Sequence, residues 1–221
     1  MRARTRSLLL DAAVRVFARK GAGAAAIHEI AAEAGLSNGT FYNYFRTREE
    51  LVDAASLQLT ARLHREIAAS NASVPDPAER VAIGSRRFVL QAIRDPTWAA
   101  ALLRVWGGSP LLKERVVAPL LADLRAGRRA GRFRFPSEDA AVDLVQGAVL
   151  SGMRTVLEGR APEAHAAAVA GLVLRGLGVD ADGADAITRR GLPLAAPSGA
   201  IRRARAKGQV SRRALTDRWR S

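Results

Sequence analysis

Hydrophobic residues recur every three or four positions along most of the chain, which is the spacing of one face of a helix. The first such segment has Thr5 as a candidate N-cap and Gly21 as a stop, and its apolar face comprises Leu9, Leu10, Ala13, Val16 and Phe17. The same spacing predicts further helices over about 27–34, 38–45, 47–70, 76–94, 96–106, 110–130, 137–158 and 162–178, with a short last one in 181–190. No alternating pattern is long enough to predict a sheet. The sequence therefore predicts an all-α protein.

The breaks between these segments divide the chain into three parts. A capping box marks the start of the long fourth helix, because the side chains of Thr47 and Glu50 are each placed to satisfy a free backbone donor at the other residue. We therefore expect a small N-terminal domain over 1–50, a larger helical domain over 51–194 and a tail over 195–221. The tail is rich in arginine and lacks apolar periodicity, so we expect it to be largely disordered.

Composition sets a few outer limits on the protein. The 221 residues include no cysteine, which excludes disulfides and thiolate metal sites and agrees with a reducing cytoplasm. No stretch approaches the roughly 20 uncharged apolar residues that a membrane span needs, and charged residues interrupt the apolar run near the N-terminus. We therefore expect a cytoplasmic protein without membrane contact.

The formal net charge of +14 suggests an anionic partner such as nucleic acid, but two features weaken that argument. Nearly all the basic residues are arginine, a pattern that a GC-rich genome produces through codon usage alone. Much of the charge also lies after Asp180, in or near the expected tail. Charge by itself therefore does not establish nucleic-acid binding.

The segment GLSNGTFYNYF, residues 35–45, holds both tyrosines of the chain and places aromatic residues beside small polar ones. On a helix, Phe41 and Phe45 share one face, and the outward positions are Gly39, Thr40, Tyr42, Asn43 and Tyr44. The helix predicted over 27–34 precedes it across a turn at Gly35. Two short helices joined by a glycine-containing turn form a helix-turn-helix, whose second helix enters the major groove of DNA.

The longer segment AIHEIAAEAGLSNGTFYNYFRTREEL resembles the DNA-binding signature of the tetracycline-repressor (TetR) family, and the likeness covers roughly residues 5–52. The resemblance implies that 1–50 is a helix-turn-helix DNA-binding domain and 51–194 a regulatory and dimerisation domain. It implies base contacts from Asn38, Gly39, Thr40 and Asn43, and phosphate contacts from Thr40, Tyr42, Tyr44 and Arg48. Ser37 is the candidate N-cap of the reading helix and a further predicted DNA contact. His28 either reaches DNA from the preceding helix or is a solvated surface histidine.

Two positions depart from the usual pattern of that family. The family usually has Thr or Ser before the second helix, where this chain has Ala24, Ala25 and Ala26. The helix start therefore lacks a cap worth about 1 kcal/mol, which puts phosphate contacts from this helix in doubt. Position 48 is often lysine in the family, and Arg48 would keep the phosphate contact and make it bidentate.

The large side chains of the C-terminal domain are candidates for a pocket that holds a small-molecule effector. Cavities in helical domains tend to lie between helices and to use aromatic residues. For any one of these side chains ordinary core packing is the alternative, and the sequence leaves both open. The candidates are His64, Phe88, Trp98, Trp106, Phe133 and Met153.

Small residues form a stripe on each of the two helices predicted over 137–158 and 162–178, and such stripes let helices approach closely. Pairing the two helices with their copies about a two-fold axis would form a four-helix bundle. An alanine-rich chain also produces such stripes by chance, but a helix-turn-helix protein that reads two half-sites needs a partner. The predicted dimer contacts are Ala148, Ser151, Gly152, Thr155, Ala167, Gly171 and Leu174.

These features together predict a homodimeric, ligand-responsive transcriptional regulator, a repressor bound to a pseudo-palindromic operator in double-stranded DNA. One alternative is a DNA-binding protein without an effector, either constitutive or architectural. Another is an α-helical enzyme, which no paired carboxylates, metal cluster or nucleophile motif in the sequence supports. We therefore predict no catalysis, no cofactor and no metal.

Overall fold

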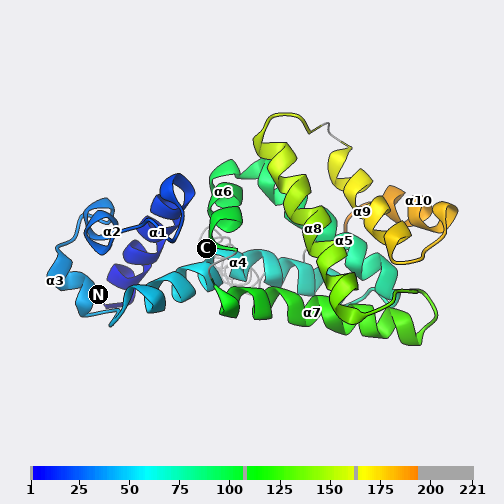
Figure 1. Ribbon diagram of the computed structural model, residues 1–221, viewed down its shortest axis with the longest axis horizontal. Coiled ribbons are helices and arrows are strands. Elements are labelled where there is room, and N and C mark those ends of the chain that lie inside the picture. Colours follow the sequence, from blue (N-terminus) through cyan, green and yellow to red (C-terminus); the bar gives the residue numbers. More distant parts are fainter. Residues whose placement is uncertain (1, 107–108, 162–163, 194–221) are drawn as a thin grey trace, which may run out of the picture.

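The computed structural model describes residues 2–106, 109–161 and 164–193, and within these ranges it contains ten helices and no strand. The all-α prediction is confirmed. The helices form an elongated molecule with a small bundle at one end and a larger one at the other (Figure 1). They are α1 (Arg2–Lys20), α2 (Ile27–Glu33), α3 (Asn38–Tyr42), α4 (Arg48–Asn71), α5 (Pro77–Arg94), α6 (Pro96–Val105), α7 (Pro110–Arg129), α8 (Glu138–Leu157), α9 (His165–Gly176) and α10 (Ala181–Arg189).

The small bundle consists of α1, α2 and α3, and its core is aromatic. Phe17, Phe41 and Phe45 are each at most 1% exposed, and Leu9 and Ile30 are fully buried beside them. The predicted apolar face of the first helix is therefore the face that packs. Burying a phenylalanine side chain stabilises a fold by about 1.5–3 kcal/mol, so three such rings are a large part of the stability of this bundle.

Two predicted ends in this bundle are wrong. α1 begins at Arg2, so Thr5 lies inside the first turn and is not the N-cap. α3 ends at Tyr42, with Asn43 as its C-cap, rather than continuing to Phe45. Phe45 is nevertheless buried, because the turn after α3 directs it back into the core.

α4 connects the two bundles as one continuous helix (Figure 1). The Thr47 hydroxyl accepts a hydrogen bond from the Glu50 amide at 3.1 Å, as predicted for a capped start. The Glu50 carboxylate accepts from the Arg46 amide at 2.8 Å instead of from Thr47, so only half of the predicted capping box is present. The same helix buries Leu51 near its start and Leu63 near its far end.

α5 is the central helix of the larger bundle, in contact with α4, α6, α7, α8, α9 and α10. It begins at Pro77 with Asp76 as its N-cap, a combination that presets the first turn. α6 packs against α5 and also against α1, so it is a second connection between the bundles. α8 is apolar and long enough to cross a membrane by composition alone, but it packs against α5, α6, α7 and α9.

The predicted helices over 76–94, 96–106, 110–130 and 137–158 all occur close to their expected bounds. The segment predicted over 162–178 forms a helix from His165, and residues 162–163 are outside the described part of the chain. The short helix expected in 181–190 is α10. The prediction of a disordered tail over 195–221 also falls outside the described residues.

Candidate DNA-binding surface and ligand cavity

The turn between α2 and α3 brings the two helices together. Gly35 has φ 70°, a conformation that residues with a side chain rarely adopt. It lets the Leu36 amide donate back to the Ala31 carbonyl at 2.8 Å, which ends α2 and redirects the chain. Ala31 is buried where the helices cross, and Phe41 of α3 packs into the same core. This geometry is a helix-turn-helix.

The outward face of α3 is polar and open. Ser37, Asn38, Gly39 and Asn43 are exposed. Tyr42 is 58% exposed, and its ring meets Phe41 edge-on at a centroid distance of 5.2 Å. The aromatic contact fixes the direction of the tyrosine while leaving its hydroxyl free for a partner outside the protein.

The remaining predicted contacts near α3 are more constrained. Ser37 is the N-cap, because its hydroxyl accepts from the Thr40 amide at 3.2 Å. The Ser37 and Thr40 hydroxyls also lie 2.9 Å apart as a hydrogen-bonded pair. Tyr44 is half-buried against the core, so only part of its ring is available to DNA. His28 is exposed on α2.

Arg48 ties the start of α4 to the loop before α2. Its Nε donates to the Ala25 carbonyl at 2.8 Å, and its Nη2 donates to the Ala22 carbonyl. The Glu29 carboxylate accepts from the Ala26 amide at 3.2 Å, but Ala26 has no side-chain acceptor for the first amides of α2. The sequence assigned Arg48 to phosphate, but two of its donors hold the loop that precedes the helix-turn-helix.

The acidic residues of α2 are paired with basic residues of α1. Arg15 and Arg19 both contact the Glu33 carboxylate, at 2.7 and 2.6 Å, and Lys20 contacts Glu29. Hydrogen bonds from Arg15 and Arg19 lower the pKa of Glu33, and a hydrogen bond from Lys20 lowers the pKa of Glu29. These contacts compensate the negative charge that α2 would otherwise present beside the reading helix.

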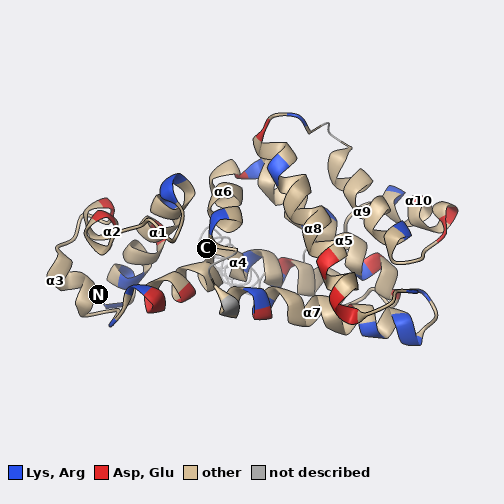
Figure 2. Ribbon diagram, in the orientation of Figure 1, with Lys and Arg blue, Asp and Glu red and all other residues tan. Residues whose placement is uncertain are grey.

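Several exposed arginines near the reading helix were not among the predicted site residues. α3 carries no charged residue, but arginines lie at the starts of α1 and α4 (Figure 2). The Arg6 guanidinium lies 5.1 Å from the centre of the Phe45 ring, and the Arg46 side chain is 94% exposed. Arg2 and Arg4 are exposed on the first turn of α1. The basic N-terminal run MRARTRS was the available signal, and its place beside α3 depends on the tertiary fold.

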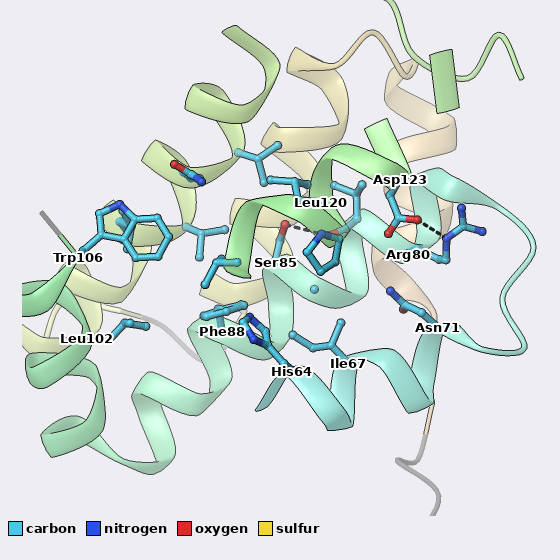
Figure 3. Close-up of a pocket in the computed structure, with 18 residues that line it drawn as sticks. His64, Ile67, Asn71, Arg80, Ser85, Phe88, Leu102, Trp106, Leu120 and Asp123 are labelled. Atoms are coloured by element: carbon cyan, nitrogen blue, oxygen red, sulfur yellow. Dashed lines mark hydrogen bonds and ion pairs between the residues drawn. The ribbon is translucent and has the colours of Figure 1, made fainter. Parts of the chain in front are cut away.

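A cavity of about 110 Å³ lies between α4, α5, α6, α7 and α8 in the larger bundle (Figure 3). Of the predicted ligand contacts, His64, Phe88 and Trp106 line it. Most of the remaining wall is aliphatic. The further lining residues are Ile67, Asn71, Arg80, Val81, Gly84, Ser85, Leu102, Val116, Pro119, Leu120, Asp123, Val145, Gln146, Val149 and Leu150.

The other three predicted ligand contacts are core residues outside this cavity. Trp98 is 7% exposed, and its indole nitrogen donates to the Leu59 carbonyl at 2.7 Å. Phe133 is buried against Gly127, where an added Cβ would lie only 2.1 Å from the ring. Met153 is fully buried. Packing explains all three, as the alternative interpretation allowed.

The charged and polar groups of the cavity wall differ in whether they have a hydrogen-bond or ion-pair partner. Arg80 and Asp123 form an ion pair at 2.6 Å at one end, beside Asn71 (Figure 3). His64 meets the Phe88 ring edge-on at 6.0 Å, and burial, aided by the positive charge of Arg115, lowers its pKa. His64 also borders a second pocket with Thr60, Arg65 and Arg115. His64 therefore lies between the cavity and a more polar pocket.

The predicted dimer stripe is partly internal to one protomer. Gly152, Gly171 and Leu174 are buried, and an added Cβ on Gly152 would lie 3.1 Å from Val169 of α9. These three residues therefore pack the protomer's own helices, which corrects their assignment to a dimer contact. Ser151 is exposed, and Ala148, Thr155 and Ala167 are half-buried. The outward face of α8 and α9 instead presents Leu144, Gly147, Ser151, Ala168 and Leu172.

Both parts of the chain match described families. Residues 9–55 match the bacterial regulatory proteins of the tetR family, and residues 76–190 match the tetracyclin repressor-like C-terminal domain. The chain belongs to the TetR family. The resemblance identified from the reading segment is therefore confirmed, and the C-terminal match extends it across α5 to α10.

Named relatives are transcriptional regulators. The uncharacterized HTH-type regulator Rv1255c of Mycobacterium tuberculosis is 36% identical over 118 residues, which cover 52% of this chain and 58% of that protein. The chain thus spans less than two thirds of that relative's length. BetI of Rhizobium meliloti is 36% identical over 76 residues, covering 34% of this chain and 37% of BetI.

Solved structures of the TetR family share the whole fold. RolR in complex with resorcinol is 29% identical, with a TM-score of 0.64, over 88% of this chain and 98% of RolR. A putative TetR regulator from Shewanella superposes with a TM-score of 0.69 at 20% identity, over 80% of this chain and 99% of that protein. The second likeness concerns the fold alone.

Proposed function

We propose that this protein is a cytoplasmic transcriptional repressor that binds operator DNA through α2 and α3 and is released by a small molecule in the cavity. The observation that carries the proposal is the continuity of α4. Its first turns pack Leu51 and Ala55 into the DNA-binding bundle, and its last turns supply His64, Ile67 and Asn71 to the cavity wall. One rigid helix therefore joins the two sites.

The DNA contacts follow from exposure on and around α3. Asn38, Gly39, Thr40 and Asn43 face the bases, and asparagine suits adenine because its amide both donates and accepts. Tyr42 contacts phosphate, with a smaller contribution from half-buried Tyr44. The exposed arginines at the starts of α1 and α4 add sequence-independent attraction to phosphate. They are Arg2, Arg4, Arg6 and Arg46.

Arg48 acts mainly by fixing the position of α2 relative to α4. Its two hydrogen bonds to the loop at Ala22 and Ala25 hold α2 at a fixed distance from α4. A ligand-induced shift of α4 would therefore pull on α2 as well as on α3. Charge-assisted hydrogen bonds to carbonyls are stronger than neutral ones, which suits a contact that must transmit movement.

A second route joins the cavity to the DNA-binding bundle through α6. Leu102 and Trp106 line the cavity from this helix and its C-cap. Arg104, two residues from each along the chain, donates to the Arg19 carbonyl near the end of α1. A ligand that displaces Trp106 would thus move α1 directly. The repressor needs a ligand preference of only about 1–3 kcal/mol for the released state to weaken operator binding by roughly 5–150-fold.

Dimerisation through α8 and α9 completes the proposed repressor. Leu172 of α9 is 65% exposed and Leu144 of α8 is 38% exposed, so each helix presents a large apolar side chain outward. Pairing this face with its copy would bury both leucines in a four-helix arrangement. Two reading helices could then engage successive major grooves about 34 Å apart on a pseudo-palindromic operator.

The proposed effector is small. An apolar cavity of about 150 Å³ in another protein binds benzene, and the cavity of about 110 Å³ here is of that order. RolR, a relative with the same fold, binds resorcinol, a single-ring compound. A ligand of this size fits the space between Phe88 and Trp106 without separating the helices widely.

The test begins with DNA selected from a random pool by the purified protein. We expect one pseudo-palindromic sequence to be enriched and to bind at least about 1,000-fold more tightly than random DNA. Small ring compounds are then screened for release of that DNA, and each active compound is titrated with and without it. Because coupling is reciprocal, operator DNA must weaken the binding of a true effector by the same factor.

A DNA-binding protein without an effector is the second candidate, and the basic residues around α1 favour it to some extent. An architectural protein would show a steep salt dependence and little sequence preference. Failure to enrich any sequence would support that alternative. Enrichment without release by any compound would leave a constitutive repressor.

A further inference from the structure

Two buried polar atoms in the wall of the cavity have no hydrogen-bond partner among the described residues. They are Oδ1 of Asn71, the last residue of α4, and Nε2 of Gln146 on α8. Buried polar groups in folded proteins are nearly always paired, because an unpaired one has lost its water without replacement. Both residues belong to the cavity wall, next to the space that a molecule in the cavity would occupy.

The charged groups of the cavity wall already have partners. Arg80 donates to Asp123 at 2.6 Å and to the carbonyls of Val74 and Pro75 at 3.0 Å. The lowered pKa of His64 keeps its imidazole neutral near pH 7. No lining residue therefore offers an uncompensated charge, and a charged ligand would lose its hydration without an ionic partner.

The apolar part of the cavity wall sets the shape of the occupant. The Phe88 ring and the Trp106 indole lie on the wall with Ile67 and Leu102 (Figure 3). Aromatic walls favour a planar occupant through offset or edge-on contacts. At about 110 Å³ the space suits one ring rather than two fused rings.

We infer that Asn71 and Gln146 determine ligand specificity, and that the effector is an uncharged single-ring compound bearing hydroxyl groups. The orphan atom of Asn71 is an acceptor and that of Gln146 is a donor, and a hydroxyl group satisfies either, since it both donates and accepts. The two amides come from different helices, so a ring with two hydroxyls fits better than a ring with one. This inference rests on the proposed function, since it names the ligand of the same cavity.

The test compares benzene, phenol and resorcinol as ligands of the full-length protein by calorimetry. The expected order of affinity is resorcinol, phenol, benzene, with about tenfold between neighbours in the series. Asn71→Leu and Gln146→Met replace each amide by an apolar group of similar size. Each should reduce the preference for hydroxylated rings by about tenfold and leave benzene affinity unchanged or higher.

Gln91→Met is the matched control, because Gln91 lies on α5 and does not line the cavity. This variant should change neither the affinity for the three rings nor the preference for the hydroxylated ones. Melting temperature without ligand gives an independent measurement. Asn71→Leu and Gln146→Met should raise it, because each removes an unpaired buried group, whereas a merely structural amide would lower it when replaced.

Equal affinity for benzene and phenol, or full preference retained in both variants, would overturn the inference. Failure of all three rings to bind would overturn it as well. Operator release measured on the same samples separates this failure from that of the proposed function. Hydroxylated rings that bind with the expected preference but release no DNA would refute the function alone. Release by a charged compound that is indifferent to Asn71 and Gln146 would refute only the inference.

Discussion

Gly84 offers the sharpest test of the cavity as the effector site. It lies on α5 in the cavity wall, and a Cβ added to it would meet no atom within 4 Å. Gly84→Leu should therefore place a side chain in the space that the effector needs without a clash at the backbone. The expected product is a repressor that binds its operator and no longer responds to the effector.

The stability change of this variant can be worked out from the structure. Replacing a mid-helix glycine by a good helix former contributes about 1 kcal/mol. Filling a cavity of about 110 Å³ at about 24 cal/mol per Å³ contributes at most about 2.6 kcal/mol. The restricted leucine side chain costs about 0.5–1 kcal/mol, and imperfect fit costs about 1–3 kcal/mol. With the cavity filled, the net change therefore lies between roughly zero and 2 kcal/mol in favour of the variant.

Gly84→Ala is the matched control, because it has the same helix preference and adds only one methyl group. A chain of this size gains about 2–4 °C in melting temperature per kcal/mol. We expect the alanine variant to melt about 2–4 °C higher and to keep its effector response. The leucine variant should melt no lower than the natural chain, and its effector affinity should fall at least tenfold.

The assay is operator binding by fluorescence anisotropy with increasing effector, combined with thermal unfolding of each variant. Unchanged effector affinity in Gly84→Leu would refute the placement of the effector in this cavity. A fall in melting temperature of many degrees would show that the space is not available to a side chain, which would refute the geometric argument itself. Loss of operator binding together with retained stability would show that filling the cavity favours the released state.

Three further predictions concern named residues of the two sites. Arg48→Lys keeps the charge but cannot hold both the Ala22 and Ala25 carbonyls in a fork. Operator affinity should therefore fall about tenfold with an unchanged salt slope. An unchanged affinity would indicate that Arg48 contacts phosphate instead of holding the loop. Asn43→Ala should alter base preference at one position of each half-site by about 1–3 kcal/mol, measured by repeating the DNA selection, and an equal loss on all sequences would contradict a reading role. His64, whose pKa is lowered by burial, binds a proton more readily in the unfolded chain. The free energy of unfolding should therefore decrease as pH falls below about 6.5, and His64→Gln should remove that part of the pH dependence; an identical pH profile in the variant would show that another group is responsible.

Local rules in the sequence were sufficient for most helices but less so for their ends. Pro and Gly near the breaks placed the helices of the larger bundle close to their observed bounds, and the structure adds Asp76, Asp95 and Ser137 as the N-caps of α5, α6 and α8. The start of α1 and the end of α3 were missed. The end of α3 is set by how Phe45 must turn to reach the core, which is not a local property.

In the candidate site too, features set by residues close in sequence could be predicted, and features set by tertiary contacts could not. Exposure of Asn38, Gly39, Tyr42 and Asn43 agrees with the helical face assigned from residue spacing, since these positions are close in sequence. Arg48 contacts a loop more than twenty residues away, so its tie to Ala22 and Ala25 was not visible from spacing. Residue size alone does not distinguish a residue that lines a cavity from one that packs in the core. Only half of the ligand candidates therefore line the cavity.

What the sequence by itself determined was the helical class, the helix-turn-helix and the family, because each depends on residue types at fixed short spacing. Only the tertiary structure decided which residues surround the cavity, which small residues pack internally and which arginines lie beside the reading helix. The unpaired amides of Asn71 and Gln146 belong to this second group. Whether a polar atom is buried and unpaired depends on every neighbour that folding brings to it, and those neighbours come from helices far apart along the chain.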